Sequence, residues 1–334
     1  MDPLSQGVFG ALWASTASKK ENLRQALALG AVSGMASDLD VLISSDSDPL
    51  LALEYHRHFT HSLAFIPIGA LICALVLQYF IKGVPFRKRY LYCFLGFASH
   101  GILDAFTSYG TQLLWPFSSF RVAWDSIAII DPLFTIPLLV ALVIGAYRRS
   151  LKPRNFALVW AMLYLGLGFV QRDRAIAEVR KLAESRGHVP LRLSAKPSIG
   201  NLWLFRGLYE TKTHHYADAI RVPILGPSKV YEGGSLKRFD VNALQIPADS
   251  RLMKDIERFA WFSDNALALS PSQPRGGVPI IIGDFRYAML PTGIEPLWGI
   301  IVDPSKPDAH VIFDSFRNVE ARDRAELWRM LMGQ

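Results

Sequence analysis

The sequence is poor in cysteine and in charged residues. Only two cysteines, Cys73 and Cys93, occur in 334 residues, and each lies in an apolar stretch. Neither a disulfide framework nor a cysteine-based zinc module is therefore expected. Charged residues make up 19% of the chain, against about 25% in soluble proteins, whereas 51% is hydrophobic. This composition argues against an ordinary soluble protein and also excludes a disordered, low-complexity chain.

Long apolar segments are concentrated in the first half of the chain. Residues 64–81 carry no charged side chain over 18 residues, which is long enough to cross a bilayer. Similar segments are found at 90–110, 127–147 and 155–171. Two shorter stretches, about 3–17 and 25–43, predict a helical hairpin arm. We therefore expect residues 1–171 to form an α-helical membrane bundle of four to five spans plus this arm.

The positions of the basic residues along the chain are more informative than the net charge of +7. Loops 82–89 and 148–154 are rich in Lys and Arg and contain no acid, so the positive-inside rule places them in the cytoplasm. Connections 45–60 and 111–126 then face outward. No cleavable signal peptide is expected at the amino terminus. Nucleic-acid binding is not expected, because the basic clusters are short topology loops.

Residues 172–334 have the composition of a small α+β soluble domain. A charged helical pattern covers 172–186, and further helical patterns lie near 249–262 and 318–332. Aromatic and β-branched runs predict strands. These runs are 203–210, 215–223, 278–285, 296–303 and 310–317. The parity of the expected spans makes this domain extracytoplasmic in a multi-pass membrane protein.

Acids and imidazoles recur at the ends of the expected membrane helices. Such groups are costly near lipid, so each one is a candidate functional residue. The set is Asp38, Asp40, His56, His61, His100 and Asp104. His100 and Asp104 are four residues apart and share one helix face. The expected topology gathers the whole set at the outer side of the membrane.

Imidazole nitrogen and carboxylate oxygen together suit zinc, and manganese or iron where oxygen dominates. The six groups predict one divalent ion with supporting residues, or two ions that share a carboxylate. A bound ion would activate water as a nucleophile. Arg57 is placed to hold a phosphate or a developing oxyanion. Either Asp38 or Asp40 could act as general base instead of ligand, and Asp40 and Arg57 are our catalytic candidates.

Several other polar residues are better explained without a metal. His58 is expected to be an interfacial side chain, and His214 and His215 strand or surface residues. Asp131, which precedes Pro132, is as well explained by helix capping as by a role beside the metal. Gly30 and Gly34 form a small-xxx-small pair of the kind that lets helices pack closely.

The ordered combination of motifs resembles a known family. The segments that carry the resemblance are SDLDVL (37–42), HRHFTHSL (56–63), SHGILDAFTSYGTQLLWPF (99–117) and IDPLFTIPLL (130–139). They are similar to the YdjM-like, or YbcI-like, membrane-bound metal-dependent hydrolases of bacteria. The resemblance covers residues 1–145 well, and the tail looks like that of the longer members. It implies an integral membrane protein with a metal site, named a hydrolase from its His and Asp pattern.

One position departs from this pattern. The family usually opens with a motif like MDxxTH, whereas this chain has MDPLSQ, so Gln6 stands where histidine is expected. Glutamine is a poorer zinc ligand than imidazole. Either the remaining groups suffice, or the site has lost a metal.

The sequence thus favours a membrane metal-dependent hydrolase that acts at the outer face. A site at this depth suits a membrane-associated substrate such as a lipid phosphate or an ester. Two alternatives stay open. One is a non-catalytic membrane scaffold or regulator, and the other is a protein that handles divalent cations or protons.

Overall fold

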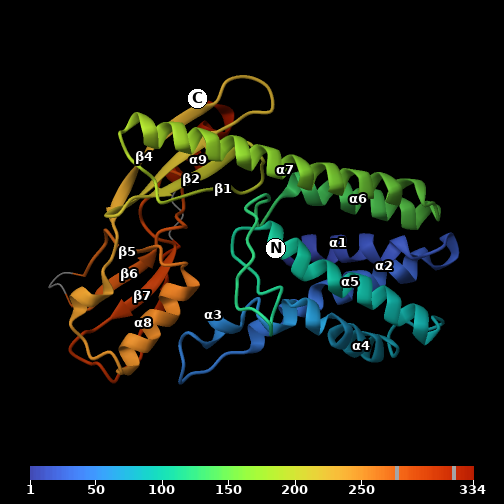
Figure 1. Ribbon diagram of the computed structural model, residues 1–334. Coiled ribbons are helices and arrows are strands. Elements are labelled where there is room, and N and C mark those ends of the chain that lie inside the picture. Colours follow the sequence, from blue (N-terminus) through green and yellow to red (C-terminus); the bar gives the residue numbers. More distant parts are fainter. Residues whose placement is uncertain (275–277, 318–320) are drawn as a thin grey trace. The chain divides into compact units, whose positions relative to one another are not determined.

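The computed structural model describes residues 1–274, 278–317 and 321–334, and the chain divides into two compact units (Figure 1). The first unit comprises Met1–Ile43, Tyr55–Val170 and Ile199–Leu202. The second comprises Ser44–Glu54, Gln171–Ser198 and Trp203–Gln334. A short segment from the amino-terminal half of the chain therefore belongs to the second unit.

The first unit is helical. Its main elements are α1 (Pro3–Thr16), α2 (Leu23–Met35), α4 (Ile66–Leu77), α5 (Phe86–Phe106), α6 (Pro132–Arg148) and the first half of α7 (Lys152–Ser185). Short 3-10 helices lie between them, at Lys20–Asn22, at Ala36–Leu42 (η2), at Phe59–His61 (η3) and at Leu63–Phe65. The five-residue helix α3 (Leu51–Tyr55) lies between η2 and η3 in the sequence.

Glycines set the distance between α1, α2 and α5. A Cβ atom at Gly34 would lie 2.9 Å from the Cα atom of Gly10, and one at Gly30 would clash with the carbonyl oxygen of Gly10. On the other side, a Cβ atom at Gly96 of α5 would lie 2.8 Å from the Cα atom of Gly30. The predicted packing role of Gly30 and Gly34 is therefore confirmed.

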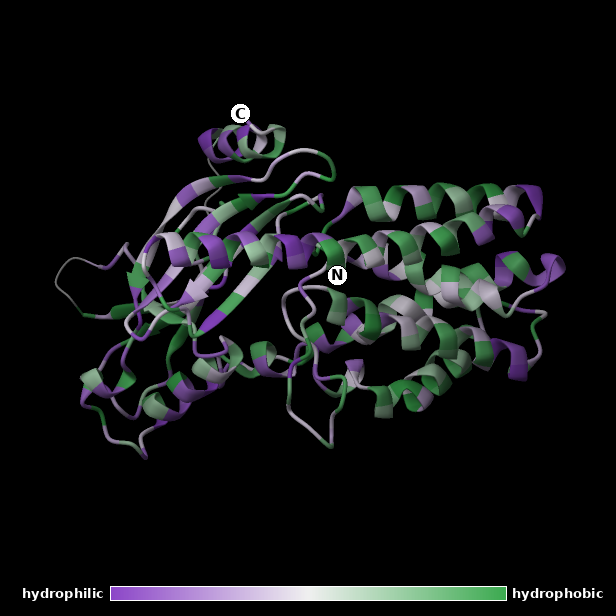
Figure 2. Ribbon diagram, turned by 45° about the horizontal axis from the view of Figure 1, so that its top comes forward, coloured by the Kyte–Doolittle hydropathy of each residue, from purple (hydrophilic) through white to green (hydrophobic). Residues whose placement is uncertain are grey.

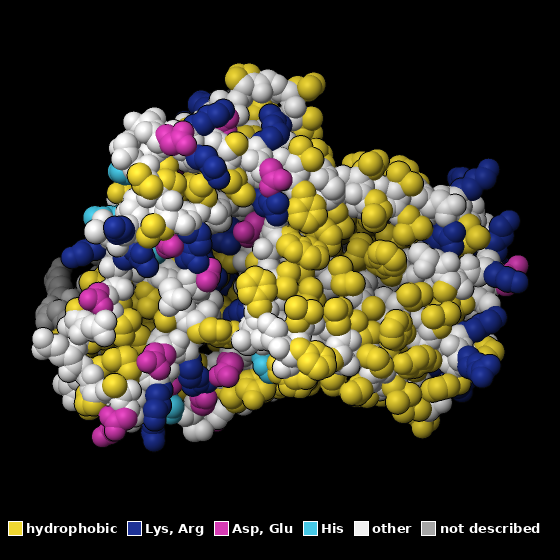
Figure 3. Space-filling view, viewed as in Figure 1, with side chains coloured by type: hydrophobic (Ala, Val, Ile, Leu, Met, Phe, Trp, Pro, Cys, Tyr) yellow, Lys and Arg dark blue, Asp and Glu magenta, His cyan; other side chains and the backbone are white. Residues whose placement is uncertain are grey.

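Large apolar side chains are exposed over much of the first unit. Figure 2 shows that its helices are mainly hydrophobic, and Figure 3 shows apolar side chains over its visible surface. A patch of this size marks contact with lipid or protein. The exposed residues include Ile68, Leu71, Ile72, Leu75 and Val76 on α4, Leu133, Ile136, Val140 and Val143 on α6, and Phe156, Val159, Met162 and Leu163 on α7.

Helix length does not confirm four to five spans. Among the described residues, one helix, α7, is long and apolar enough to cross a membrane, and the pair Leu51–His61 and Leu63–Leu77, bent by 59°, passes the same test together. Helix α6 is apolar but shorter. At 1.5 Å per residue, α1, α2 and α4 are only about 18–21 Å long, less than the roughly 30 Å of a hydrocarbon core.

The second unit contains two antiparallel four-stranded sheets, each with its strands in sequence order. The first sheet has β1 (Arg192–Pro197), β2 (Leu204–Glu210), β3 (His214–Arg221) and β4 (Lys229–Lys237). The second has β5 (Leu267–Leu269), β6 (Ile280–Asp284), β7 (Trp298–Val302) and β8 (Ile312–Ser315). Helices α8 (Arg251–Phe262) and α9 (Ala321–Met332) complete the unit.

The second half of α7 packs against the first sheet. Ala175, Val179 and Ala183 form one buried cluster with Phe205 and Ile220. The expected apolar segment 155–171 and the expected charged helix 172–186 are thus one continuous helix of 34 residues. Its first half exposes apolar side chains, and its second half is amphipathic.

The five predicted strands coincide with β2, β3, β6, β7 and β8 to within two residues at either end. Strands β1, β4 and β5 were not predicted. Strand β4 contains two glycines, β1 has Ser, Lys and Pro among its six residues, and β5 is only three residues long, so their patterns are weak. The predicted helices near 249–262 and 318–332 are found as α8 and α9, except that residues 318–320 lie outside the described residues.

Candidate metal centre

Three segments far apart in the sequence bring acids and imidazoles together. Helix α2 runs directly into η2, which carries Asp38 and Asp40. The short helix η3 ends at His61, and the last two turns of α5 carry His100 and Asp104. His61, His100 and Asp104 are buried, whereas the side chain of Asp38 is 23% exposed. The cluster is therefore open to solvent mainly at Asp38.

Asp38, His61, His100 and Asp104 each offer one ligand atom, and these four atoms lie within 4.8 Å of one another. Asp38 Oδ1 lies 3.2 Å from His100 Nε2 and 3.4 Å from His61 Nε2. Asp104 Oδ2 lies 3.3 Å from His61 Nε2 and 3.6 Å from His100 Nε2. Ligands about 2.0–2.2 Å from a tetrahedral zinc ion are themselves about 3.3–3.6 Å apart, so the spacing fits such an ion.

The tautomers of the two histidines follow from their other ring nitrogens. His100 Nδ1 faces the carbonyl oxygen of Gly34 at 2.5 Å, which can only accept a hydrogen bond. His61 Nδ1 lies 3.2 Å from the Asp40 carboxylate. Each Nδ1 atom is therefore placed to carry a proton, and in the neutral imidazole each Nε2 atom then presents a lone pair.

The two lone pairs face each other, because His61 Nε2 and His100 Nε2 are 2.9 Å apart. Asp38 and Asp104 add only acceptor oxygens to the same point. Asp104 Oδ2 is buried and makes no hydrogen bond within the described residues, although Arg57 Nε lies 3.2 Å away. With both imidazoles neutral, four hydrogen-bond acceptors converge without a hydrogen-bond donor among them. A shared cation would stabilise this arrangement, and two nitrogen and two oxygen ligands suit a divalent metal.

Asp40 lies behind His61. Its Oδ2 atom accepts hydrogen bonds from the main-chain N–H of Arg57 at 2.9 Å and from the hydroxyl of Thr60 at 3.0 Å, and it lies 3.2 Å from His61 Nδ1. This is the carboxylate–histidine arrangement that orients a metal ligand. Asp40 is thus placed to orient the His61 ring, and it is not among the four residues of the first cluster.

His56 lies on the other side of Asp40. Its Nδ1 atom is 3.0 Å from Asp40 Oδ1. Asp38, Asp40 and His56 form a second group whose ligand atoms also lie within 4.8 Å of one another. The structure thus places all six predicted ligands in two adjoining groups that share Asp38, and both one-ion and two-ion arrangements stay open.

Arg57 is 5% exposed and has a left-handed backbone, with φ of 64°. Its Nη1 atom donates to the Thr107 hydroxyl at 2.9 Å, and its guanidinium lies 4.9 Å from the ring centre of Tyr109. The arginine therefore contributes a positive charge beside Asp104, at the buried side of the cluster.

Gln6 reaches the same carboxylate from helix α1. Its Nε2 atom donates to Asp104 Oδ1 at 2.8 Å, and its Oε1 atom is buried and has no hydrogen-bond partner in the described part of the chain. The main-chain nitrogen of Met1 contacts the same oxygen. Position 6, where the family motif has histidine, therefore adjoins the cluster.

Gly101 allows η3 to approach α5. A Cβ atom at this position would clash with the carbonyl oxygen of His61. The glycine beside His100 is thus needed to bring the two imidazoles together. Neither Gly101 nor Thr60 was predicted as a site residue, although both lie within the quoted motifs.

The remaining polar candidates lie outside the two groups. Asp131 caps α6, accepting from the main-chain N–H of Leu133 at 3.1 Å, and also accepts from the hydroxyl of Tyr164. His58 packs against aromatic rings, with its ring centre 5.5 Å from that of Trp115. His214 and His215 lie on β3, as predicted.

The cluster and the basic loops lie at opposite ends of the first unit. Helix α5 begins at Phe86, within the basic segment 82–89 that was predicted as a loop, and it ends at Phe106 just after Asp104. Helix α2 carries Arg24 in its first turn and ends before Asp38. Figure 3 shows Lys and Arg side chains gathered at the end that carries these loops. The acids and imidazoles that could hold an ion are at the other end.

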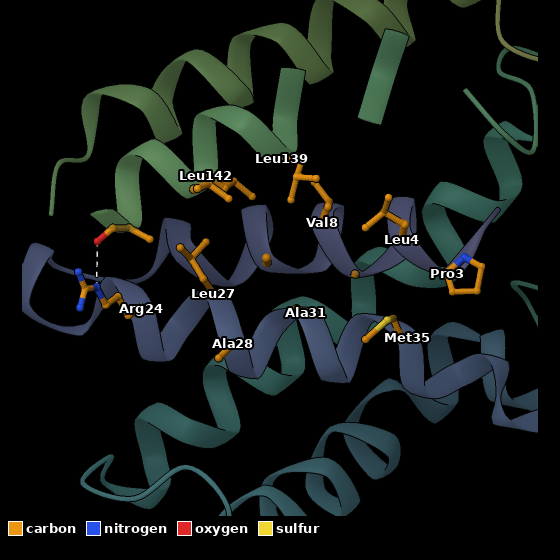
Figure 4. Close-up of a pocket in the computed structure, with 14 residues that line it drawn as sticks. Pro3, Leu4, Val8, Arg24, Leu27, Ala28, Ala31, Met35, Leu139 and Leu142 are labelled. Carbon is orange, nitrogen blue, oxygen red and sulfur yellow. Dashed lines mark hydrogen bonds between the residues drawn. The ribbon is translucent and has the colours of Figure 1, made fainter. Parts of the chain in front are cut away.

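An apolar groove between α1, α2 and α6 is separate from this centre (Figure 4). It has a volume of about 430 Å³, and Arg24 is the only charged residue among the described residues that line it. The Nε atom of Arg24 donates to the carbonyl oxygen of Ala146 at 2.9 Å. These described lining residues include no acid or imidazole, which distinguishes the groove from the cluster.

A helical, largely apolar unit with a His and Asp cluster at one end defines a membrane protein with a candidate metal site. Residues 1–175 match the family described as YdjM inner membrane protein, and the chain belongs to this family. The resemblance inferred from the motifs is therefore confirmed, as is association with the bilayer.

The comparison with a curated relative adds little about activity. The chain is 31% identical over 109 residues to "Uncharacterized protein YfhP" of Bacillus subtilis (strain 168). The matched region covers 33% of each chain, so this chain spans about a third of the length of that relative. No solved structure matches.

Proposed function

We propose that this protein is a multi-pass inner-membrane hydrolase that depends on a divalent metal and acts on a membrane-associated lipid phosphate or ester. The convergence of His61 Nε2, His100 Nε2 and two carboxylate oxygens without a donor among them carries the proposal. Zinc suits this mixed nitrogen and oxygen set best, with manganese and iron as alternatives.

In this proposal Asp38, His61, His100 and Asp104 hold the ion, and His56 and Asp40 support it or take part in a second site. When bound, the ion polarises a phosphoryl or carbonyl oxygen and lowers the pKa of water. The chain's own residues orient the reaction. Asp40 holds the His61 ring through Nδ1 and is the candidate general base, and the Arg57 guanidinium supplies positive charge for an anionic group.

The location of the cluster supports the substrate class. It lies at the end of the helical unit opposite the basic loops, and the positive-inside rule makes that the outer end. The unit also exposes apolar side chains along α4, α6 and α7. A substrate that lies in or against the outer leaflet can reach such a site without leaving the membrane. The carboxy-terminal domain is then extracytoplasmic.

Gln6 favours a second candidate, a non-catalytic scaffold or regulator whose metal is structural. Its amide occupies the place where the family motif has an imidazole, and it contacts Asp104. In that case the protein would bind metal and hydrolyse nothing.

Metal content and turnover together test these proposals. The detergent-solubilised protein, purified without a polyhistidine tag, is expected to contain a divalent metal by elemental analysis and to hydrolyse at least one member of a lipid-phosphate and ester panel. Chelation is expected to abolish turnover, and Zn²⁺ or Mn²⁺ to restore it. Absence of metal would overturn the metal centre, whereas bound metal without turnover would favour the scaffold.

A further inference from the structure

We propose that Arg258, on helix α8 of the second unit, is a positioning residue for the metal centre. It holds the segment Ser44–Glu54, which connects the two ligand-bearing 3-10 helices. This inference rests on the proposed function, because it takes the His and Asp cluster to be a metal site. It assigns to the carboxy-terminal domain a role in the affinity of that site.

The connectivity of the chain gives the segment its importance. Asp38 and Asp40 lie on η2, directly before Ser44–Glu54, and His56, Arg57 and His61 follow directly after it. Every ligand that does not come from α5 is therefore attached to one end of this segment. Its conformation sets how η2 and η3 are presented to each other.

Arg258 binds the segment through two carboxylates. Its Nη1 and Nη2 atoms donate to Asp48 Oδ1 and Oδ2 at 3.0 and 2.9 Å, a bidentate pair. Its Nε and Nη2 atoms donate to Glu54 Oε2 at 3.1 and 2.7 Å. Burial alone would raise the pKa of Asp48, but the hydrogen bonds from Arg258 lower it. Planar bidentate pairing of this kind fixes geometry as well as charge.

The arginine is itself held in place by its own helix. Asp255, 3% exposed in its side chain, accepts from Arg258 Nη1 at 3.2 Å and lies one turn earlier on α8. The other oxygen of Asp255 lies 2.7 Å from His310 Nδ1 and accepts from the main-chain N–H of Val311. Asp255 therefore holds the guanidinium from its own helix while the guanidinium binds Asp48 and Glu54.

The segment is ordered by internal contacts. Asp48 Oδ1 also accepts from the main-chain N–H of Leu50 at 3.0 Å, and Ser45 pairs with Asp48 as an isolated bridge. Leu50 is 1% exposed, and its carbonyl oxygen accepts from the N–H of Glu54 at 3.0 Å. Asp48 thus joins the turn of the segment to Arg258. The α3 label in Figure 1 marks the helix that contains Glu54, and the α8 label marks the helix that contains Arg258.

Release of this contact is expected to weaken metal binding without removing a ligand. A site whose ligands are already held in place loses little further conformational entropy when the ion binds. A mobile connection between η2 and η3 would have to become ordered on binding, and this would weaken the affinity. Loss of residues that support metal ligands typically costs about tenfold or more in metal affinity. We expect a loss of about tenfold when Arg258 no longer holds the segment.

The test measures the Kd of the full-length, detergent-solubilised protein for Zn²⁺ by competition with a chromophoric chelator. Arg258→Gln is expected to weaken binding about tenfold, and Arg258→Lys less, because lysine keeps the charge and loses the fork. The double variant Asp48→Asn/Glu54→Gln should match Arg258→Gln while it leaves the Asp255–Arg258 pair in place. Hydrogen exchange of residues 44–54 should accelerate in both.

Arg192→Gln is the matched control. Arg192 lies in the same unit and pairs with Glu210 and Asp264, none of which belongs to the segment. Its loss is expected to leave the Kd unchanged. The opposite result would be that the natural protein binds Zn²⁺ with the same Kd as Arg258→Gln and Asp48→Asn/Glu54→Gln, despite faster hydrogen exchange in both variants. In that case the inference is wrong and the metal centre stands. If the natural protein binds no Zn²⁺, the proposed function fails as well.

Discussion

His61 Nε2 and His100 Nε2 lie 2.9 Å apart although the imidazoles come from different helices, 39 residues apart in the sequence. In the neutral imidazoles both nitrogens present lone pairs, so a close pair of this kind is stabilised by a metal cation or by a proton between them.

His61→Ala and His100→Ala are each expected to reduce metal content at least tenfold, because each removes one of the two nitrogen ligands. Elemental analysis of the purified variants measures the change. His58→Ala is the control, since His58 belongs to the same motif and lies outside both ligand groups. Equal metal content in all three variants would exclude the centre.

Asp40→Asn is expected to retain the metal and to bind it about 10–100-fold more weakly. The amide can keep one hydrogen bond with the main-chain N–H of Arg57, but it loses the charge that orients His61 Nδ1. Chelator competition with Zn²⁺ gives the affinity. A complete loss of metal would instead make Asp40 a direct ligand, through the group that it forms with Asp38 and His56.

Gln6→His is expected to tighten metal binding about tenfold, because it places an imidazole beside Asp104 where the amide now donates. Gln6→Leu, which offers no ligand, is the control and should not tighten binding. The variant also tests activity. New turnover in Gln6→His, absent from the natural chain, would show that this chain has lost catalysis.

Gly101→Ala is expected to disrupt the centre, because the added Cβ clashes with the carbonyl oxygen of His61 and separates η3 from α5. Metal content should fall as far as in His61→Ala. Gly166→Ala is the matched control, as nothing lies within 4 Å of a Cβ at that position of α7. That variant should bind metal normally and be neutral or about 0.5–1 kcal/mol more stable.

Because His215 is buried, we expect the stability of the second unit to depend on pH. His215 is 3% exposed on β3, and burial lowers its pKa to about 4 from 6.5. The unfolded chain therefore binds the proton more tightly, so stability should fall as the pH falls from about 6.5 to 4, by up to roughly 3 kcal/mol. Denaturant unfolding at several pH values measures the slope. His215→Phe should flatten it, and an unchanged slope would assign the effect to other groups.

Much of the second unit could be predicted from the sequence. Five strands and both helices α8 and α9 carry strong local patterns, apart from residues 318–320, which lie outside the described residues. Strands β1, β4 and β5 have weak patterns and form by pairing with neighbours. The number of spans was the least secure prediction, because hydropathy marks 64–81 as one apolar segment and does not show where α4 begins or ends.

The sequence by itself determined the composition of the site, since imidazoles and carboxylates at the ends of apolar helices have few other uses. It also determined the family, through the order of its motifs. The tertiary structure alone decided which groups meet. Asp38 and Asp40 are two residues apart, yet Asp38 faces both Nε2 atoms and Asp40 faces His61 Nδ1. Such roles depend on side-chain direction in a 3-10 helix and on close backbone approach at Gly101, which arise only when distant segments pack.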